Sequence, residues 1–203
     1  MHAAHPHVQG VAGGIGIDDA GRVHDDYVDR LGHGTAVTAV IREKAPSAEI
    51  WAIKVFDREL SATGVALVAA LQWAIVRRAQ LINLSLGTTR ADYEADLIRE
   101  IQQSRAEGSL IVCAAPDETR RWLPGALDGV VRVRADVTIG RDDFQVESER
   151  SGKTIIKASP YPRPIPGVPP VKNLRGQSFA VANVCGLLAR AWPNLPAWCS
   201  QLH

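Results

Sequence analysis

The sequence predicts an α/β fold in three layers: a mostly parallel β-sheet with helices on both of its faces. Short apolar runs typical of buried strands alternate with longer segments in which apolar residues recur at helical spacing. The connecting segments between these strands and helices are short. Right-handed crossovers between parallel strands place helices on both faces of a sheet. At 203 residues, the chain is expected to form one domain, residues 1–203, with a substantial core.

The central part of the chain carries the clearest alternation. Apolar runs predict strands at residues 50–56, 81–86 and 110–115, and helical spacing predicts helices at 65–79 and 93–106. Gly108 ends the second helix. The pattern is weaker between residues 117 and 175, where we expect short strands at 130–133 and 154–157 and an extended proline-rich loop at 159–170. A last helix is expected from Ser178 to Ala191, ahead of Pro193.

Composition excludes several classes of function. The net charge of +1 gives no electrostatic reason to expect nucleic acid or an acidic membrane surface as a partner. We expect no membrane association, since no apolar run approaches the length of a membrane span. Three cysteines without metal-ligand spacing predict neither a metal nor a cofactor, and Cys113 and Cys185 are interpreted as small buried hydrophobes. With no secretory signal pattern at the N-terminus, the expected location is cytoplasmic.

Two short segments far apart in the chain carry potential catalytic side chains. His33 lies in a Gly-His-Gly-Thr segment, and Ser178 lies in a Gly-Gln-Ser-Phe-Ala segment. Each segment opens onto an apolar helix, and a helix N-terminus favours negative charge that develops beside it. Serine Oγ is a poor nucleophile until an imidazole takes its proton. The pair therefore indicates a nucleophilic hydrolase.

With these residues the chain resembles the subtilase family of subtilisin-like serine peptidases. The segments around His33 and Ser178 are similar to the family's histidine and nucleophile motifs. Between them, Leu-Ile-Asn-Leu-Ser-Leu-Gly at residues 81–87 is similar to the strand beside its substrate cleft. Ile-Val-Cys-Ala-Ala at residues 111–115 is similar to the strand that leads to its oxyanion residue. The four segments occur in the family's order, and residues 117–175 match it only loosely.

The resemblance implies roles for individual residues. Ser178 would attack the scissile carbonyl, with His33 as general base and then general acid. The backbone N–H of Ser178 would be one oxyanion donor. An extended peptide or protein substrate would bind beside two segments, and the implied contacts are Ser85, Leu86, Gly87, Ala114 and Ala115. Asn83 is interpreted as a sheet-edge residue outside the site.

Two positions depart from the family's pattern. By the register of His5-Pro6-His7-Val8, the family's catalytic aspartate would lie three residues before Met1. A shifted start, a cut chain or a genuine loss would each explain this. Internal acids that precede His33 are interpreted mainly as loop carboxylates; they are Asp18, Asp19, Asp25, Asp26 and Asp29. Where the family has an oxyanion asparagine, this chain has Asp117, which could donate a hydrogen bond only if it were protonated.

The sequence thus predicts a subtilisin-like serine endopeptidase that cleaves an extended peptide. Two alternatives remain. The chain could be a catalytically impaired relative that binds peptide in the same cleft, or a structural partner subunit that uses only the sheet. The presence or absence of the catalytic acid distinguishes the active peptidase from the catalytically impaired relative.

Overall fold

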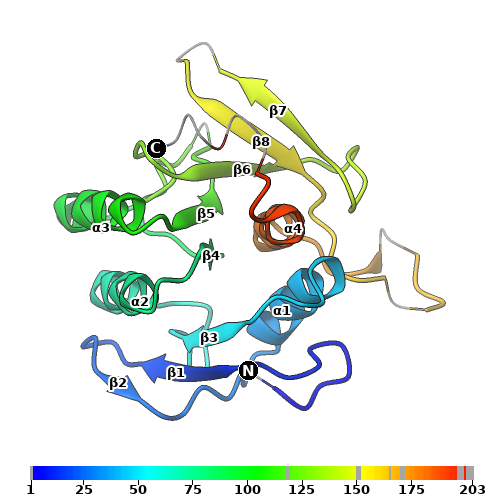
Figure 1. The fold of residues 1–203 in the computed structure, drawn as a ribbon, viewed down its shortest axis with the longest axis horizontal. Helices are drawn as coiled ribbons and strands as arrows, with labels where there is room; N and C mark the ends of the chain where they lie inside the picture. The colour runs from blue at the N-terminus through cyan, green and yellow to red at the C-terminus, as the bar shows by residue number, and fades with distance from the viewer. Residues whose placement is uncertain are drawn as a thin grey trace.

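The structure, a computed structural model, describes residues 2–117, 119–149, 152–164, 166–169, 172–195 and 199. Figure 1 shows helices on both sides of the strands, with α2 and α3 on one side and α1 and α4 on the other. The elements in chain order are β1 (Gly13–Ile17), β2 (Val23–His24), α1 (His33–Lys44), β3 (Trp51–Lys54), α2 (Gly64–Val76), β4 (Leu81–Leu84), the 3-10 helix η1 (Ala91–Tyr93), α3 (Glu94–Ala106), β5 (Leu110–Ala114), β6 (Val131–Ala135), β7 (Phe144–Ser148), β8 (Thr154–Ala158) and α4 (Gln177–Ala191).

The strands form two sheets. One has the order β2-β1-β3, and the other has the order β4-β5-β6-β8-β7. The pairs β1–β3, β4–β5, β5–β6 and β6–β8 are parallel, whereas β2 and β7 add antiparallel strands at the edges. The predicted α/β architecture with a mostly parallel sheet is confirmed.

Strand β5 shows why the sheet needs helices on both faces. All of its first four residues are buried, and successive side chains of a strand point to opposite faces. Leu110 and Val112 belong to the core that contains residues of α4, whereas Ile111 and Cys113 belong to the core that contains residues of α2 and α3. A strand covered on both faces is a continuous apolar run, which is the pattern the sequence shows.

A capping side chain fixes the start of α2, and packing against each other positions α1 and α4. Thr63 caps α2, since its Oγ1 accepts a hydrogen bond from the Ala66 N–H at 3.1 Å. Helices α1 and α4 pack together through Val37, Val40, Phe179 and Ala182, all of them buried. This contact sets the N-termini of α1 and α4 side by side.

The structure also differs from the predicted elements in places. The predicted strands 50–56 and 81–86 end two residues earlier, at Lys54 and Leu84, so the residues that follow belong to the connecting segments. Strands β1, β2 and β7 were not predicted. The apolar signal of β1 is interrupted by glycine, although its last three residues are buried; β2 has only two residues, and β7 is exposed along most of its length. Among the described residues, no helix combines the length and apolar character needed to cross a bilayer.

Candidate active site

His33 and Ser178 lie at the N-termini of two neighbouring helices. His33 is the first residue of α1, and Ser178 is the second residue of α4. The ring of Phe179, the residue after Ser178, has its centroid 6.2 Å from that of His33. The structure therefore brings together two residues that are 145 positions apart in the chain. Within the described ranges no hydrogen bond joins them, and such bonds are often made only once substrate is bound.

The His33 imidazole has an aromatic environment. Its centroid is 6.3 Å from the ring of Phe56 on one side and 6.2 Å from Phe179 on another. Burial lowers the pKa of His33 below its ordinary value, and the negative charge of Asp29 opposes that shift only in part. A lowered pKa keeps the imidazole neutral at neutral pH. The neutral form is the one that can accept a proton from serine.

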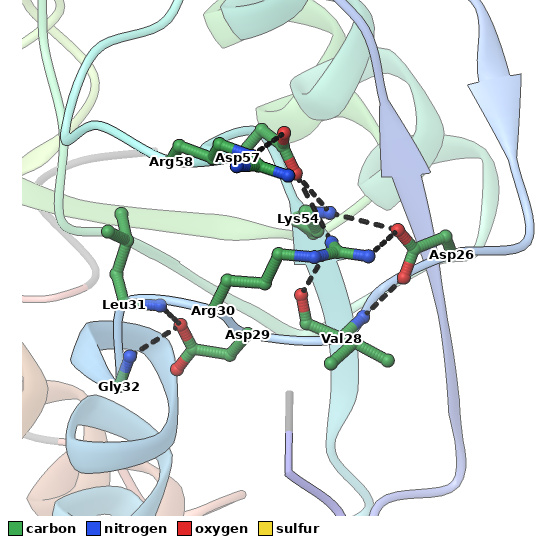
Figure 2. A network of polar contacts seen from close by, with 9 residues as sticks. All are labelled: Asp26, Val28, Asp29, Arg30, Leu31, Gly32, Lys54, Asp57 and Arg58. Carbon is green, nitrogen blue, oxygen red and sulfur yellow. Dashed lines mark hydrogen bonds and ion pairs between the residues drawn. The ribbon is translucent and has the colours of Figure 1, made fainter.

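Asp29 holds the start of α1. Its Oδ1 accepts hydrogen bonds from the N–H groups of Leu31 and Gly32 at 3.0 and 2.8 Å, as Figure 2 shows. Its Oδ2 accepts from the N–H and the Oγ1 of Thr35, both at 2.7 Å. Burial opposes ionisation of Asp29, yet the hydrogen bonds from Thr35, Leu31 and Gly32 outweigh it and hold the pKa below its ordinary value. Asp29 is thus an ionised helix cap beside His33.

Two of the other acids in the segment before His33, Asp18 and Asp26, have structural partners. Asp26 contacts Arg30 and Lys54, and Asp57 contacts the same two cations from the segment after β3 (Figure 2). Asp18 accepts hydrogen bonds from the N–H groups of Ala20 and Arg22 and from the Arg22 side chain. Of the five acids considered from sequence, only Asp29 contributes to the electrostatics of His33.

Ser178 is tied to the segment that follows β4. Its Oγ donates a hydrogen bond to the Ser85 carbonyl at 3.3 Å, and the Ser85 Oγ donates to the Ser178 carbonyl at 3.3 Å. Asn83 joins this pair, since its Nδ2 donates to the Ser85 Oγ at 2.9 Å. Asn83 was interpreted from sequence as lying outside the site. A role closer to the site could have been inferred from the sequence, because Asn83 is a polar residue in an otherwise apolar strand.

Gln177 is a positioning residue that the sequence analysis missed. Its Oε1 accepts from the Ala135 N–H at 2.9 Å, and its Nε2 donates to the Val133 carbonyl at 2.6 Å. These two bonds anchor the first turn of α4 to the carboxyl end of β6. The signal was available in the sequence, because a glutamine directly before a nucleophile candidate can reach adjacent backbone groups.

The five predicted substrate contacts lie at the carboxyl ends of neighbouring strands. Leu84 of β4 pairs with Cys113 of β5, so Ser85 and Ala114 continue from the same level of the ladder. The two segments are therefore neighbours at this edge of the sheet. The first comprises Ser85, Leu86 and Gly87, and the second comprises Ala114 and Ala115, whose N–H donates to the Val133 carbonyl at 2.7 Å. Leu86 packs against the core cluster beneath.

The carboxylate of Asp117 is an acceptor in its own loop. Its Oδ1 accepts from the Thr119 Oγ1 and N–H and from the Arg120 N–H, and its Oδ2 accepts from the Trp122 Nε1 at 3.2 Å. The Thr119 hydrogen bonds in particular lower the pKa of Asp117 to about 2. At neutral pH Asp117 is therefore ionised, and an ionised carboxylate has no proton to donate to an oxyanion.

In the described part of the chain, the cysteines and the potential metal ligands do not form a further reactive or metal-binding site. Cys113 and Cys185 are buried, as predicted, and burial raises the pKa of each thiol to about 12. Within the described ranges, no group of three or more His, Cys, Asp or Glu side chains is arranged to hold a metal ion.

The comparisons with known proteins agree with the fold and the order of the segments. The sequence model of the subtilase family, peptidase S8, matches residues 15–155. The chain therefore belongs to the subtilase family. That match includes His33 and the strands of the predicted cleft and ends before Ser178.

Individual relatives are subtilisin-like proteins. A thermostable alkaline protease of Halalkalibacterium halodurans is 28% identical over 97% of this chain and 55% of its own length. Subtilisin DY of Bacillus licheniformis is 27% identical over 83% of this chain and 67% of its own length. This chain thus spans about half the length of the first of these relatives.

Solved structures show the same fold. A cold-adapted subtilisin-like serine proteinase aligns over 100% of this chain and 76% of its own, with a TM-score of 0.70 and 18% identity. The S218A mutant of the PatA protease domain aligns over 94% of this chain and 75% of its own, with a TM-score of 0.62 and 20% identity.

Proposed function

We propose that this chain is a subtilisin-like serine endopeptidase domain in which Ser178 is the nucleophile and His33 the general base. The observation that carries the proposal is the placement of a neutral, half-buried imidazole beside the N-terminus of the helix that bears Ser178. The substrate is an extended peptide or protein segment that lies along residues 85–87 and 114–115. Its backbone would pair there as an added strand.

The chemistry follows from these positions. The Ser178 hydroxyl turns from the Ser85 carbonyl toward His33, which takes its proton as Oγ bonds to the scissile carbonyl carbon. The backbone N–H of Ser178 lies in the first turn of α4, where N–H groups have no intrahelical partner, so it can stabilise the oxyanion. Protonated His33 then gives its proton to the leaving amine as the C–N bond breaks. Water releases the acyl group by the reverse sequence.

A second candidate function is a peptide-binding site with little or no hydrolysis. Among the described residues, no carboxylate forms a hydrogen bond to His33, and Asp117 is ionised in its loop. Loss of the triad aspartate in subtilisin lowers kcat by about 3 × 10⁴. The segments that would bind peptide do not depend on that aspartate.

Labelling with a fluorophosphonate probe, detected as intact mass, distinguishes the two functions. The probe is applied to this chain and to its Ser178→Ala variant. A further pair carries an aliphatic strand fused directly before Met1, ending in Asp-Thr-Gly or, as the matched control, Asn-Thr-Gly. The fusion places the acid three residues before Met1, at the register that the sequence motif indicates.

For the proposed enzyme, we expect the Asp fusion to be labelled faster than the Asn fusion and labelling to vanish with Ser178→Ala. Labelling that survives Ser178→Ala would contradict the nucleophile assignment. Absence of labelling in every form, with retained peptide binding, would support the second function.

A further inference from the structure

An open pocket of about 310 Å³ lies between the segment that follows β5 and the hairpin formed by β7 and β8. This volume is at the lower end of the range for small-molecule sites. The residues 33, 85–87 and 178 do not line it, so the pocket is separate from the proposed catalytic pair and from the substrate contacts that follow β4. The charged side chains that line it are Asp117, Arg120, Arg121, Arg132, Glu149 and Lys153.

Arg132 is the most deeply buried cation of this pocket, with only 4% of its surface exposed. Its Nε and Nη2 donate hydrogen bonds to the carbonyls of Gly125 and Leu127 at 2.8 and 2.5 Å, and Nη2 also donates to the Asp128 carboxylate at 2.8 Å. Among the described residues, Nη1 has no hydrogen-bond partner, and it is not one of the polar atoms that the protein encloses. The two N–H groups of Nη1 are therefore accessible where Arg132 lines the pocket.

The carboxylate that pairs with Arg132 compensates its charge only in part. The Asp128 side chain is 83% exposed, and the same Oδ1 also lies 3.1 Å from the Lys153 Nζ. One exposed carboxylate thus serves two cations, one of them buried. Because a buried charge is costly unless it is well paired, a bound anion beside Arg132 would be stabilising.

Arg120 brings a further cation, and it has no ion-pair partner in the described part of the chain. Its guanidinium lies 5.6 Å from the ring centroid of Trp122, within the range of a cation–π contact. The neighbouring Arg121 is different, since both carboxylate oxygens of Glu94 accept hydrogen bonds from it at 2.6 and 2.7 Å. Arg120 is therefore the cation of this segment that can turn to a ligand.

The two acids that line the pocket already have partners. The Glu149 carboxylate pairs with Arg134 at 3.0 Å. The Asp117 carboxylate accepts hydrogen bonds within its own loop. The side chains described around the pocket thus combine four cations with two engaged carboxylates, which favours an anionic ligand.

We propose that this pocket binds a phosphate anion, either as inorganic phosphate or as the phosphate group of a small ester. Arg132 Nη1 and the Arg120 guanidinium supply N–H donors from two segments, and Lys153 adds positive charge from the β7–β8 hairpin. Phosphate has more acceptor oxygens and more negative charge than a carboxylate, so it matches this set better. The bound anion would link the segment after β5 to the hairpin and stabilise the fold, whether or not Ser178 is a nucleophile.

Thermal unfolding tests the site. The Tm is measured while inorganic phosphate replaces sodium chloride at constant ionic strength, so that charge screening stays the same. The proteins are the native chain, Arg120→Gln, Lys153→Gln and Arg58→Gln, and each is compared with its own Tm in chloride. Arg58 is the matched control, because its side chain is 87% exposed and its ion-pair partner is Asp57 in the segment after β3.

We expect phosphate to raise the Tm of the native chain and of Arg58→Gln along the same saturable curve. Arg120→Gln and Lys153→Gln should each weaken the apparent affinity by about tenfold or more, as expected for the loss of one charged contact. O-phosphoserine, titrated in the same way, distinguishes the two sources of phosphate. Tighter binding than inorganic phosphate would support a phosphate ester as the ligand, and equal or weaker binding would support free phosphate.

Two results would overturn the site. The first is a native chain whose Tm rises only linearly with phosphate, because exclusion of phosphate from the surface produces such a rise in any protein. The second is a saturable curve that is identical in the native chain and in both pocket variants, since phosphate would then bind elsewhere. Neither result bears on the labelling of Ser178, so the proposed function is tested separately.

Discussion

At the residue scale, burial of the His33 imidazole sets the pH range in which it could act as a base. Burial lowers the His33 pKa, and the neutral form is the one that would act as the proposed general base. Activity should therefore fall as the pH decreases through a midpoint below the ordinary value of 6.5. Phe56→Ala admits water to the imidazole, so it should raise that midpoint toward 6.5.

The midpoint is measured by NMR titration of the His33 ring protons. For any form of the protein that the fluorophosphonate probe labels, it is also measured by the pH dependence of the labelling rate. Phe144→Ala on the edge strand β7 is the control and should leave the titration unchanged. A midpoint that is unaltered or lower in Phe56→Ala would show that burial by this ring does not determine the pKa.

Asp117 is the second residue with a consequence for the chemistry. Asp117→Asn retains an oxygen for the Thr119 and Arg120 N–H groups, removes a negative charge and adds an N–H donor. Loss of one oxyanion donor typically costs about 10²–10³ in kcat, so a gained donor should speed labelling and turnover at pH 7. Rates are measured with the fluorophosphonate probe on the Asp fusion. Slower turnover would show that the Asp117 carboxylate has a role of its own.

At the element scale, the start of α1 depends on one side chain. Asp29 accepts four hydrogen bonds from residues 31, 32 and 35. Asp29→Ala should lower the free energy of unfolding by about 1–2 kcal/mol, the range found when a side chain that bonds the first N–H groups of a helix is removed. Urea denaturation measures the loss, and Asp25→Ala, an exposed acid in the same segment, should change it by no more than about 0.5 kcal/mol.

The pH dependence of the Asp29 contribution has a definite sign. The folded-state pKa is lower than the unfolded value of 3.8, so the unfolded chain binds more protons at acid pH. The stabilisation is present above pH 3.8 and is lost as the pH falls through the folded-state pKa. The difference between wild type and Asp29→Ala should therefore shrink on acidification; a constant difference would indicate that charge plays no part.

The elements also show which parts of the fold could be predicted from sequence. Strands β4 and β5 and helices α2 and α3 were predicted because burial on one or both faces requires a regular apolar pattern. Strand β7 was missed because it lies at the sheet edge and four of its five residues are exposed. Pairing with β8 through backbone hydrogen bonds holds it in place, and backbone bonds leave no mark on the side-chain pattern.

At the scale of the whole molecule, each sheet ends in a strand whose outer edge pairs with no other strand among the described residues. This strand is β3 in the sheet β2-β1-β3 and β4 in the sheet β4-β5-β6-β8-β7. Ile53 of β3 packs against the core cluster that contains Ile82 and Leu84 of β4, so these edges share one core. The His2 N–H donates to the Thr35 Oγ1 at 3.3 Å, so chain added at the N-terminus starts beside α1. A fused strand could therefore reach this region.

The Asn-Thr-Gly fusion tests this arrangement without the catalytic acid. If its strand pairs with β3 and β4, the Tm should rise by about 3 °C or more, which for a chain of this size corresponds to about 1 kcal/mol. A version with proline in the middle of the fused strand is the control and should give no increase, since proline cannot donate to a ladder. Equal Tm values for the two fusions would show that the strand does not enter the sheet.

The sequence by itself determined the family resemblance, the alternation of strands and helices, and the His33 and Ser178 segments, because each depends on residue types within a short window. The tertiary structure decided what depends on contacts between distant segments. It placed the Phe179 ring beside His33, linked Asn83 through Ser85 to Ser178, and kept Asp117 ionised in its loop. Burial and hydrogen-bond partners set the charge and position of a side chain, and both arise only when the elements pack.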